Sequence, residues 1–288
     1  MQEFSPIIAG TMTWGQWGKN LDTKAMASRI DACVALGITT FDHADIYGGY
    51  TTEAEFGAAF TASGAKRESV QFISKCGIQY PCDARPLAVK HYDYSPKHLK
   101  NSVAQSLKNL HTDYLDLLLL HRPSPLMDYA LVVETLEDLV QEGSILAWGV
   151  SNFTPSQLQL LKAYQKPQWN QIECSVTHTS PLLDGTLDTH QQLQIGTMAW
   201  SPLGSYFKNS DEITQRLTAC MTPLLEKYHC DASQLLLAWL RKHPAGILPV
   251  VGTTTPERLK DAMAATKIDL SLEDWFTLTE ASWGHRFP

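Results

Sequence analysis

Residues 39–49 read TTFDHADIYGG: a short apolar run is followed at once by ionisable side chains and two glycines. Asp42, His43, Asp45 and Tyr47 lie within six residues of one another. Four such groups at the end of a buried strand are costly unless they pair or carry out chemistry. A phenol donates a proton well only where a neighbour lowers its pKa from about 10, so we expect a cation beside Tyr47.

Seven further runs of strand length accompany this one. The eight apolar runs occupy 6–9, 38–41, 70–74, 114–120, 145–149, 169–173, 195–200 and 247–251. Helical spacing fills most intervals, at 22–36, 53–62, 96–110, 129–141, 155–163, 211–228 and 232–242. Strands that alternate with helices in this way are typical of parallel βα units.

Eight such units in 288 residues predict an α/β fold of the TIM-barrel type, (β/α)₈, as a single domain over residues 1–288. No G-x-G-x-x-G follows the first run, which disfavours a doubly wound sheet. The interval before 195–200 shows only a short helical pattern, and 257–265 and 272–282 predict a closing helix and an extra C-terminal helix. Ser95, Thr154 and Thr255 each precede a proline and are predicted helix caps.

Charge, apolar runs and cysteine spacing disfavour several classes of partner and compartment. The net charge of −7 disfavours nucleic acid and acidic membrane surfaces. We find no apolar run long enough to span a membrane and no secretory signal at the N-terminus. The 6 cysteines follow no paired spacing, which favours free thiols in a reducing compartment. We therefore expect a cytoplasmic protein, monomeric or weakly associating, that acts on a small molecule.

A barrel brings the C-terminal ends of its strands to one rim. The residues at these ends are Gly10, Thr11, 42–47, Lys75, His121, Arg122, Ser151, Asn152, Gln171, Glu173, Ser201, Gly252 and Thr253. Lys75 is the cation expected beside Tyr47, and at about 4 Å it would lower the phenol pKa by roughly three units. Asp42 would hold Lys75 charged, and His121 would orient a carbonyl oxygen. Such a group suits protonation of an oxygen as a carbonyl is reduced.

A second group of rim residues suits a nucleotide. The side chains of Ser151, Asn152 and Gln171 can bond a carboxamide, and Trp200 offers a flat face for stacking. After the last strand, residues 252–258 combine hydroxyls, a helix start and Arg258, which together predict an anion site.

These segments resemble the motifs of the aldo-keto reductase superfamily, in order and over nearly the whole chain. FDHADIYG, ISKCG and LLLLHRP are similar to its catalytic motifs, and WGVSNF, NQIE, WSPLG and PVVGTTTPERL to its cofactor segments. The resemblance implies NAD(P)H-dependent reduction of an aldehyde or ketone to an alcohol. It implies that Tyr47 donates the proton, Lys75 lowers its pKa, Asp42 supports Lys75 and His121 positions the carbonyl.

The same resemblance implies the cofactor site. The implied cofactor residues are Gly10, Thr11, Ser151, Asn152, Gln171, Trp200, Ser201, Pro202, Leu203, Gly204, Ser205, Gly252, Thr253 and Arg258. Many family members carry a lysine where this chain has Gly252, but Arg258 is present, and its fork suits a 2′-phosphate. We therefore predict NADPH/NADP⁺ rather than NADH.

A long insert at 74–96 and several aromatic residues are expected to wall the substrate pocket. The aromatic candidates are Trp14, Trp17, Tyr50, Tyr80, Tyr206 and Phe207, and about half of them are expected to pack loops instead. The accepted carbonyl compound is not specified by these residues.

Three other functions stay open. A metal-dependent barrel hydrolase would use Asp42, His43 and Asp45 as ligands, but the other strand ends lack further His or Asp, and we predict no metal. A Schiff-base lyase would use Lys75 as nucleophile, which leaves Arg258 unexplained. A cofactor-binding regulatory or channel-associated subunit would turn over little, whereas the four catalytic motif residues are intact. His43 and Asp45 are interpreted as structural.

Overall fold

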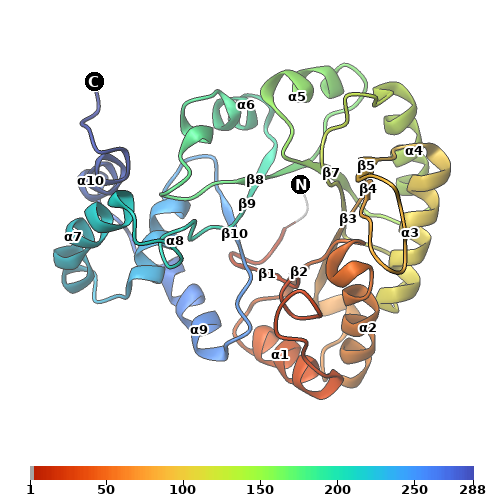
Figure 1. The fold of residues 1–288 in the computed structure, drawn as a ribbon, viewed down its shortest axis with the longest axis horizontal. Helices are drawn as coiled ribbons and strands as arrows, with labels where there is room; N and C mark the ends of the chain where they lie inside the picture. Colours follow the sequence, from red (N-terminus) through yellow and green to blue (C-terminus); the bar gives the residue numbers. More distant parts are fainter. Residues whose placement is uncertain (1–2) are drawn as a thin grey trace.

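The computed structural model describes residues 3–288 and shows a closed barrel of parallel strands surrounded by helices (Figure 1). Within these residues, eight strands close the barrel in the order β1-β10-β9-β8-β7-β6-β3-β2. They are β1 (Ile8–Gly10), β2 (Thr40–Asp42), β3 (Gln71–Cys76), β6 (Leu117–Leu120), β7 (Trp148–Ser151), β8 (Trp169–Glu173), β9 (Gly196–Trp200) and β10 (Leu248–Val251). The predicted barrel is confirmed, and each predicted strand run overlaps one of these strands.

The first strand closes the barrel. β1 pairs in parallel with β10, where Ile8 lies opposite Val250, and with β2, where Ala9 lies opposite Phe41. Because every neighbouring pair is parallel, all the strands end at the same rim. That rim therefore collects polar residues that are far apart in the sequence.

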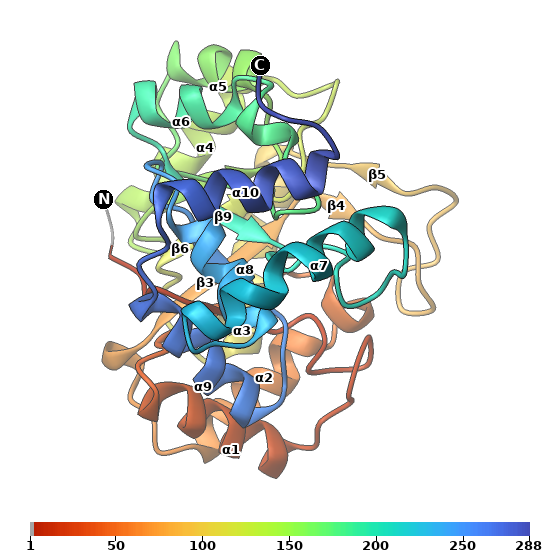
Figure 2. The same cartoon turned by 90° about the vertical axis from the view of Figure 1, so that its left-hand side faces the viewer.

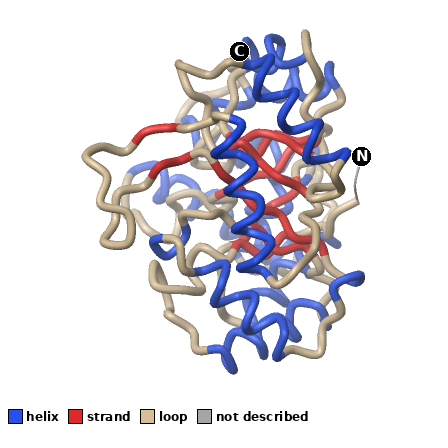
Figure 3. The backbone as a smooth tube through the Cα atoms, turned by 90° about the vertical axis from the view of Figure 1, so that its right-hand side faces the viewer, coloured by secondary structure: helices blue, strands red, loops and turns tan. Residues whose placement is uncertain are grey.

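Helices cover the outside of the barrel (Figures 1 and 3). They are α1 (Thr23–Ala35), α2 (Thr52–Ala62), α3 (Pro96–Leu110), α4 (Tyr129–Gln141), α5 (Pro155–Lys162), α6 (Thr186–Leu193), α7 (Glu212–Lys227), α8 (Ala232–Arg241), α9 (Pro256–Ala264) and α10 (Leu272–Trp283). The expected C-terminal helix is α10, which packs against α7 at one side of the barrel (Figure 1). No helix within residues 3–288 is long and apolar enough to cross a membrane.

The burial of both faces of β6 explains why its sequence is uniformly apolar. Leu117 and Leu119 belong to the cluster inside the barrel, with Ile73 and Met198. Leu118 and Leu120 belong to the larger cluster between the strands and the helices. Since successive side chains point to opposite faces and both faces are buried, no position of this strand favours a polar residue.

The insert between β3 and α3 contains a hairpin that its sequence does not indicate. Residues Ile78–Gln79 (β4) and His91–Tyr92 (β5) pair antiparallel as a small hairpin, which projects beyond the barrel strands (Figure 2). Two-residue strands carry too little periodic signal to be recognised in a sequence. The hairpin places the segment between its strands at the rim.

The predicted caps differ in their outcome. The side chains of Ser95 and Thr154 accept hydrogen bonds from the backbone of α3 and α5, as expected. Thr255 is the N-cap residue of α9 and is followed by proline, as predicted, but its side chain makes no capping hydrogen bond. Its backbone nitrogen instead donates to Thr253 Oγ1, at 3.2 Å.

A close approach of α2 and α3 yields a stability prediction. A Cβ at Gly57 would lie 2.0 Å from the carbonyl oxygen of Asn109. We expect Gly57→Ala to lower the free energy of unfolding by about 1–3 kcal/mol, because the helices must separate. Gly64→Ala is the matched control, since the nearest atom to its Cβ is 3.6 Å away. Urea unfolding measures both; equal stability of the two variants would contradict the prediction.

Candidate active site

The strand ends surround a cavity of about 1180 Å³. Asp42, Tyr47 and His121 line it. Of the predicted cofactor residues, those that line it are Gly10, Ser151, Asn152, Gln171, Trp200, Ser201, Pro202, Leu203, Gly204, Gly252, Thr253 and Arg258. Thr11 and Ser205 are not part of the lining. The volume exceeds that of ordinary small-ligand sites, so a cofactor and a substrate can share it.

Lys75 is the centre of the polar cluster. Its buried Nζ lies 2.8 and 2.7 Å from the two carboxylate oxygens of Asp42, 2.9 Å from the His43 carbonyl oxygen and 3.2 Å from Tyr47 Oη. Burial by itself lowers the pKa of the Lys75 ammonium, but Asp42 and Tyr47 outweigh it, so the pKa is raised. Lys75 is therefore charged, and the cation expected beside Tyr47 is present.

The effect of this cation on Tyr47 differs from the expectation. Burial raises the pKa of the Tyr47 phenol; Lys75 opposes this, and Asp42 adds to it. The net pKa is above its ordinary value, so the expected shift towards neutral pH was wrong. The reason is that the phenol is buried and that much of the Lys75 charge is already balanced by Asp42. In this state Tyr47 is protonated at neutral pH.

His121 faces Tyr47 across the cavity. The two ring centroids lie 6.2 Å apart, with the planes at 81°. Burial, followed by the charges of Lys75, Arg122 and Lys90, holds the pKa of His121 well below its usual range, so the ring is neutral. Its Nδ1 is buried without a hydrogen-bond partner among the described residues. This leaves Nε2 as the ring nitrogen available to a ligand in the cavity.

The predicted amide-binding residues form a connected network with the ion pair. Gln171 Nε2 donates to Asp42 Oδ1 at 2.9 Å, which leaves the Gln171 side-chain oxygen available as an acceptor. Asn152 Nδ2 donates to Ser151 Oγ at 2.7 Å, and Trp200 Nε1 donates to Asn152 Oδ1 at 2.9 Å. These bonds fix the rings and amides that line the cavity. The link from Gln171 to Asp42 crosses the barrel and was not foreseen in the sequence.

The backbone at two strand ends is unusual. Asn152, after β7, and Ser201, after β9, have φ angles of +62° and +49°. Left-handed backbone is uncommon for residues other than glycine and often marks functional sites. Both turns direct the chain along the wall of the cavity.

Thr11 and Ser205 have other partners. The Thr11 hydroxyl donates to the Asp42 carbonyl oxygen at 3.0 Å and lies 2.9 Å from His43 Nδ1. The Ser205 backbone nitrogen donates to Thr177 Oγ1 at 3.0 Å. Thr11 thus lies behind the cavity wall, and the next two residues, Met12 and Thr13, take its place in the lining.

Further lining residues were absent from the predicted site. They are Met12, Thr13, Ile46, Ile78, Lys90, Arg122, Lys208, Asp231, Ala232, Ser233, Leu237, Val250, Val251, Asp261 and Ala262. Arg122 had a signal, because it follows His121 at a strand end. Lys90 had none, since only the fold of the hairpin brings it to the rim.

The aromatic candidates divide between wall and packing. Trp17 and Phe207 line the cavity. Trp14 is fully buried in the core beside Phe41 and Phe56, so it is not a wall residue. Of the others, Tyr80 packs edge-on against Trp17, with centroids 5.2 Å apart. Tyr50 and Tyr206 are likewise not part of the lining.

His43 and Asp45 lie outside the lining. Because the Thr11 hydroxyl donates to the Asp42 carbonyl, it can only accept from His43, which makes Nδ1 the protonated nitrogen. Burial, with a smaller contribution from Lys75, lowers the pKa of His43 to about 3. Burial raises the pKa of Asp45 well above its usual range. Among residues 3–288, no group of three His, Cys, Asp or Glu side chains could hold a metal ion.

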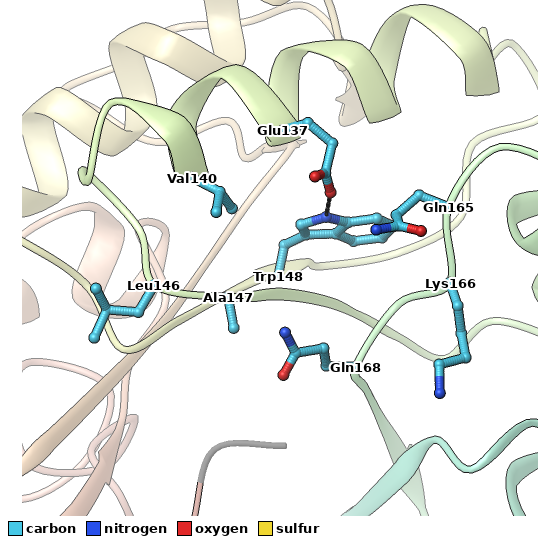
Figure 4. A pocket seen from close by; sticks show the side chains of 8 residues that line it. All are labelled: Glu137, Val140, Leu146, Ala147, Trp148, Gln165, Lys166 and Gln168. Carbon is cyan, nitrogen blue, oxygen red and sulfur yellow. Dashed lines mark hydrogen bonds between the residues drawn. The ribbon is translucent and has the colours of Figure 1, made fainter.

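A second cavity, of about 290 Å³, lies beside α4 (Figure 4). It lies at the opposite end of the barrel, because its lining residues Ala147 and Gln168 directly precede β7 and β8. Trp148 Nε1 donates there to Glu137 Oε1 at 2.7 Å. Lys166 donates to the carbonyl oxygens of Leu193 and Gln194. These polar groups already have partners, and the cavity is separate from the rim cluster.

Known proteins are similar to this chain in both sequence and fold. The model of the aldo/keto reductase family matches residues 6–282. The chain belongs to this family. It is therefore an NAD(P)H-dependent oxidoreductase that reduces carbonyl groups.

Relatives match along nearly their whole length. The oxidoreductase YcsN of Bacillus subtilis is 40% identical, with 99% of this chain and 97% of that protein covered. A 6-dehydroglucose reductase of Agrobacterium fabrum is 39% identical, with 93% and 92% covered. The crystal structure of an aldo/keto reductase from Klebsiella pneumoniae in complex with NADP and acetate has a TM-score of 0.80 at 26% identity, with 99% of this chain and 93% of that chain covered.

The buried neutral His43 predicts a pH-dependent stability. Its folded-state pKa is about 3, against an ordinary value of 6.5, so between pH 6.5 and about pH 3 only the unfolded chain takes up this proton. Stability from this residue is therefore present above pH 6.5 and lost as the pH falls. We expect the unfolding free energy of wild type, relative to His43→Asn, to fall by about 1.4 kcal/mol per pH unit between about pH 6 and 4. Urea unfolding at several pH values measures it; a constant difference between the two proteins would contradict it.

Proposed function

We propose that this enzyme reduces an aldehyde or ketone to an alcohol with NADPH and that Tyr47 donates the proton. The observation that carries the proposal is the bridge formed by Lys75, whose Nζ contacts both Asp42 and Tyr47 Oη at the wall of the cavity. A protonated phenol beside a buried cation is suited to give up its proton only when an oxyanion forms next to it.

A nicotinamide held in this cavity would supply the hydride that reduces the carbonyl carbon. Tyr47 Oη and His121 Nε2 hold the carbonyl oxygen by hydrogen bonds, which requires the neutral, Nε2-protonated form of His121. As charge develops on that oxygen, Tyr47 transfers its proton, and Lys75 stabilises the phenolate that remains. Asp42 keeps Lys75 charged and in place.

The residues of the cavity fit a nicotinamide nucleotide. The Gln171 side-chain oxygen and the Ser151–Asn152 pair are suited to the carboxamide, and Trp200 is suited to stack on the ring. The loop of Ser201 to Gly204 would lie near the pyrophosphate. Neither Thr11 nor Ser205 lines the cavity, so their proposed role is only to support its wall.

The preference for NADPH rests on Arg258. It lies in the first turn of α9, lines the cavity and has no ion-pair partner within residues 3–288. A helix start with a free guanidinium is a suitable site for the 2′-phosphate. Gly252 contributes no side chain, so Arg258 carries the preference. We further propose that the protein is cytoplasmic and that it is monomeric or weakly associating.

Replacing the proton donor tests the reaction. We expect Tyr47→Phe to lower kcat by about 100- to 10,000-fold, because the general acid is lost, while NADPH still quenches tryptophan fluorescence. NADPH absorbance with a panel of aldehydes and ketones measures the rate. Tyr164→Phe, at an exposed tyrosine outside the cavity lining, is the matched control. A Tyr47→Phe variant with wild-type kcat would exclude Tyr47 as the acid.

Replacing the phosphate-binding arginine tests the cofactor. We expect Arg258→Ala to raise KM for NADPH by about tenfold or more and to leave KM for NADH unchanged, because a charge-assisted contact is lost. Lys260→Ala removes a charge from the same helix outside the lining and serves as the control. Equal kcat/KM for the two cofactors in wild type, unaltered in Arg258→Ala, would contradict the proposed preference.

A further inference from the structure

Three cations of the cavity wall have no part in the proposed reaction: Lys208, in the loop after β9, and two that lie on the side of His121. Arg122 follows His121 after β6, and Lys90 lies in the hairpin just before β5. Neither forms an ion pair with a side chain within residues 3–288. Both charges act at His121, since they contribute to its lowered pKa after burial and Lys75. Unpaired like charges that converge on one side of a cavity attract an anion.

The acidic residues of the lining do not neutralise these cations. They are Asp42, Asp231 and Asp261. Asp42 is bound to Lys75, and Asp231 caps α8 by accepting from the backbone of Gln234. Asp261 belongs to α9, the helix that carries Arg258. The side of the cavity beside His121 is therefore positively charged.

The position of Arg122 is fixed by its backbone. Tyr94 Oη donates to the Arg122 carbonyl oxygen at 2.5 Å and accepts from the Arg122 nitrogen at 3.1 Å. A Cβ at Gly77 would lie only 2.1 Å from Tyr94 Cε1, so glycine at this position leaves room for the Tyr94 ring. Gly77 also has a φ of +107°, a backbone conformation that favours glycine. The Arg122 guanidinium carbon lies 5.6 Å from the centroid of Trp200. A buried phenol thus holds the base of a cation that reaches into the cavity.

We propose, on the basis of the carbonyl reduction above, that Arg122, assisted by Lys90, binds an oxyanion of the substrate. The substrates are then aldehydes or ketones that also carry a carboxylate or phosphate. The planar fork of arginine pairs with either group through two parallel hydrogen bonds. Between the anion and the carbonyl, the apolar body of the substrate lies against the wall that includes Trp17, Ile78 and Phe207.

Three para-substituted aldehydes of similar shape test the wild-type enzyme with NADPH. They are para-carboxybenzaldehyde, para-formylphenyl phosphate and the neutral methyl para-formylbenzoate. We expect kcat/KM for at least one anionic aldehyde to exceed that of the ester by about tenfold or more, and to fall with rising ionic strength. The two anions separate carboxylate from phosphate recognition. Equal kcat/KM for all three aldehydes would overturn the proposal and leave the reductase function intact.

Variants connect the preference to Arg122. We expect Arg122→Gln to lower kcat/KM for the preferred anion by about 10- to 100-fold with little change for the ester, and Arg122→Lys to restore part of it. Lys90→Gln should give a smaller loss of the same kind. Arg85→Gln is the control, because Arg85 lies in the same hairpin but stacks on Tyr50 outside the lining. If Arg122→Gln raises KM for NADPH and slows all three aldehydes equally, Arg122 belongs to the cofactor site and the proposal is wrong.

Calorimetric titration distinguishes failure of this inference from failure of the reductase function. The ligand is para-(hydroxymethyl)benzoate, the alcohol that corresponds to the first aldehyde, added in the presence of NADPH. Tighter binding to wild type than to Arg122→Gln would support the anion site even if no aldehyde were reduced. Equal binding to the two proteins would overturn the anion site even if the aldehydes were reduced.

Discussion

The burial of one ammonium group, Lys75 Nζ, is the constraint on which this site depends. Removing a charge from water is costly, and the cost is offset only when the ion is paired and its donors are satisfied. Asp42 supplies the opposite charge, while the His43 carbonyl and the Tyr47 hydroxyl supply neutral acceptors. The same bonds that make Lys75 tolerable in the interior fix the phenol beside it.

The barrel makes this cluster possible because its strands are apolar along their length and polar at their ends. Asp42 ends β2 and Lys75 lies near the end of β3, so parallel pairing alone brings them together. Gln171, from β8 across the barrel, then donates to Asp42 and connects the ion pair to the wall that would hold the nicotinamide. One hydrogen-bond network therefore extends from Tyr47 through Lys75 and Asp42 to Gln171.

The cations in and behind the cavity wall differ in whether their charge is free to bind a ligand. The charge of Lys75 is balanced within the protein, so it acts on the phenol beside it. Arg122, Lys90 and Arg258 have no acidic partner within residues 3–288, so their charge is available to a ligand. Arg258 lies at a helix start, and Arg122 lies beside His121. This separation suits two anions, one of the cofactor and one of the substrate.

The sequence by itself determined the barrel, most helix bounds and the residues that meet around Lys75, Asp42 and Tyr47. The signals for these features are local: apolar runs, caps and polar strand ends. It did not determine that burial raises the pKa of Tyr47, that Thr11 turns behind the wall, or that Trp14 joins the core. Nor did it place Lys90 at the rim. These outcomes depend on contacts between residues far apart in the chain, whose burial and orientation only the closed barrel and its hairpin decide.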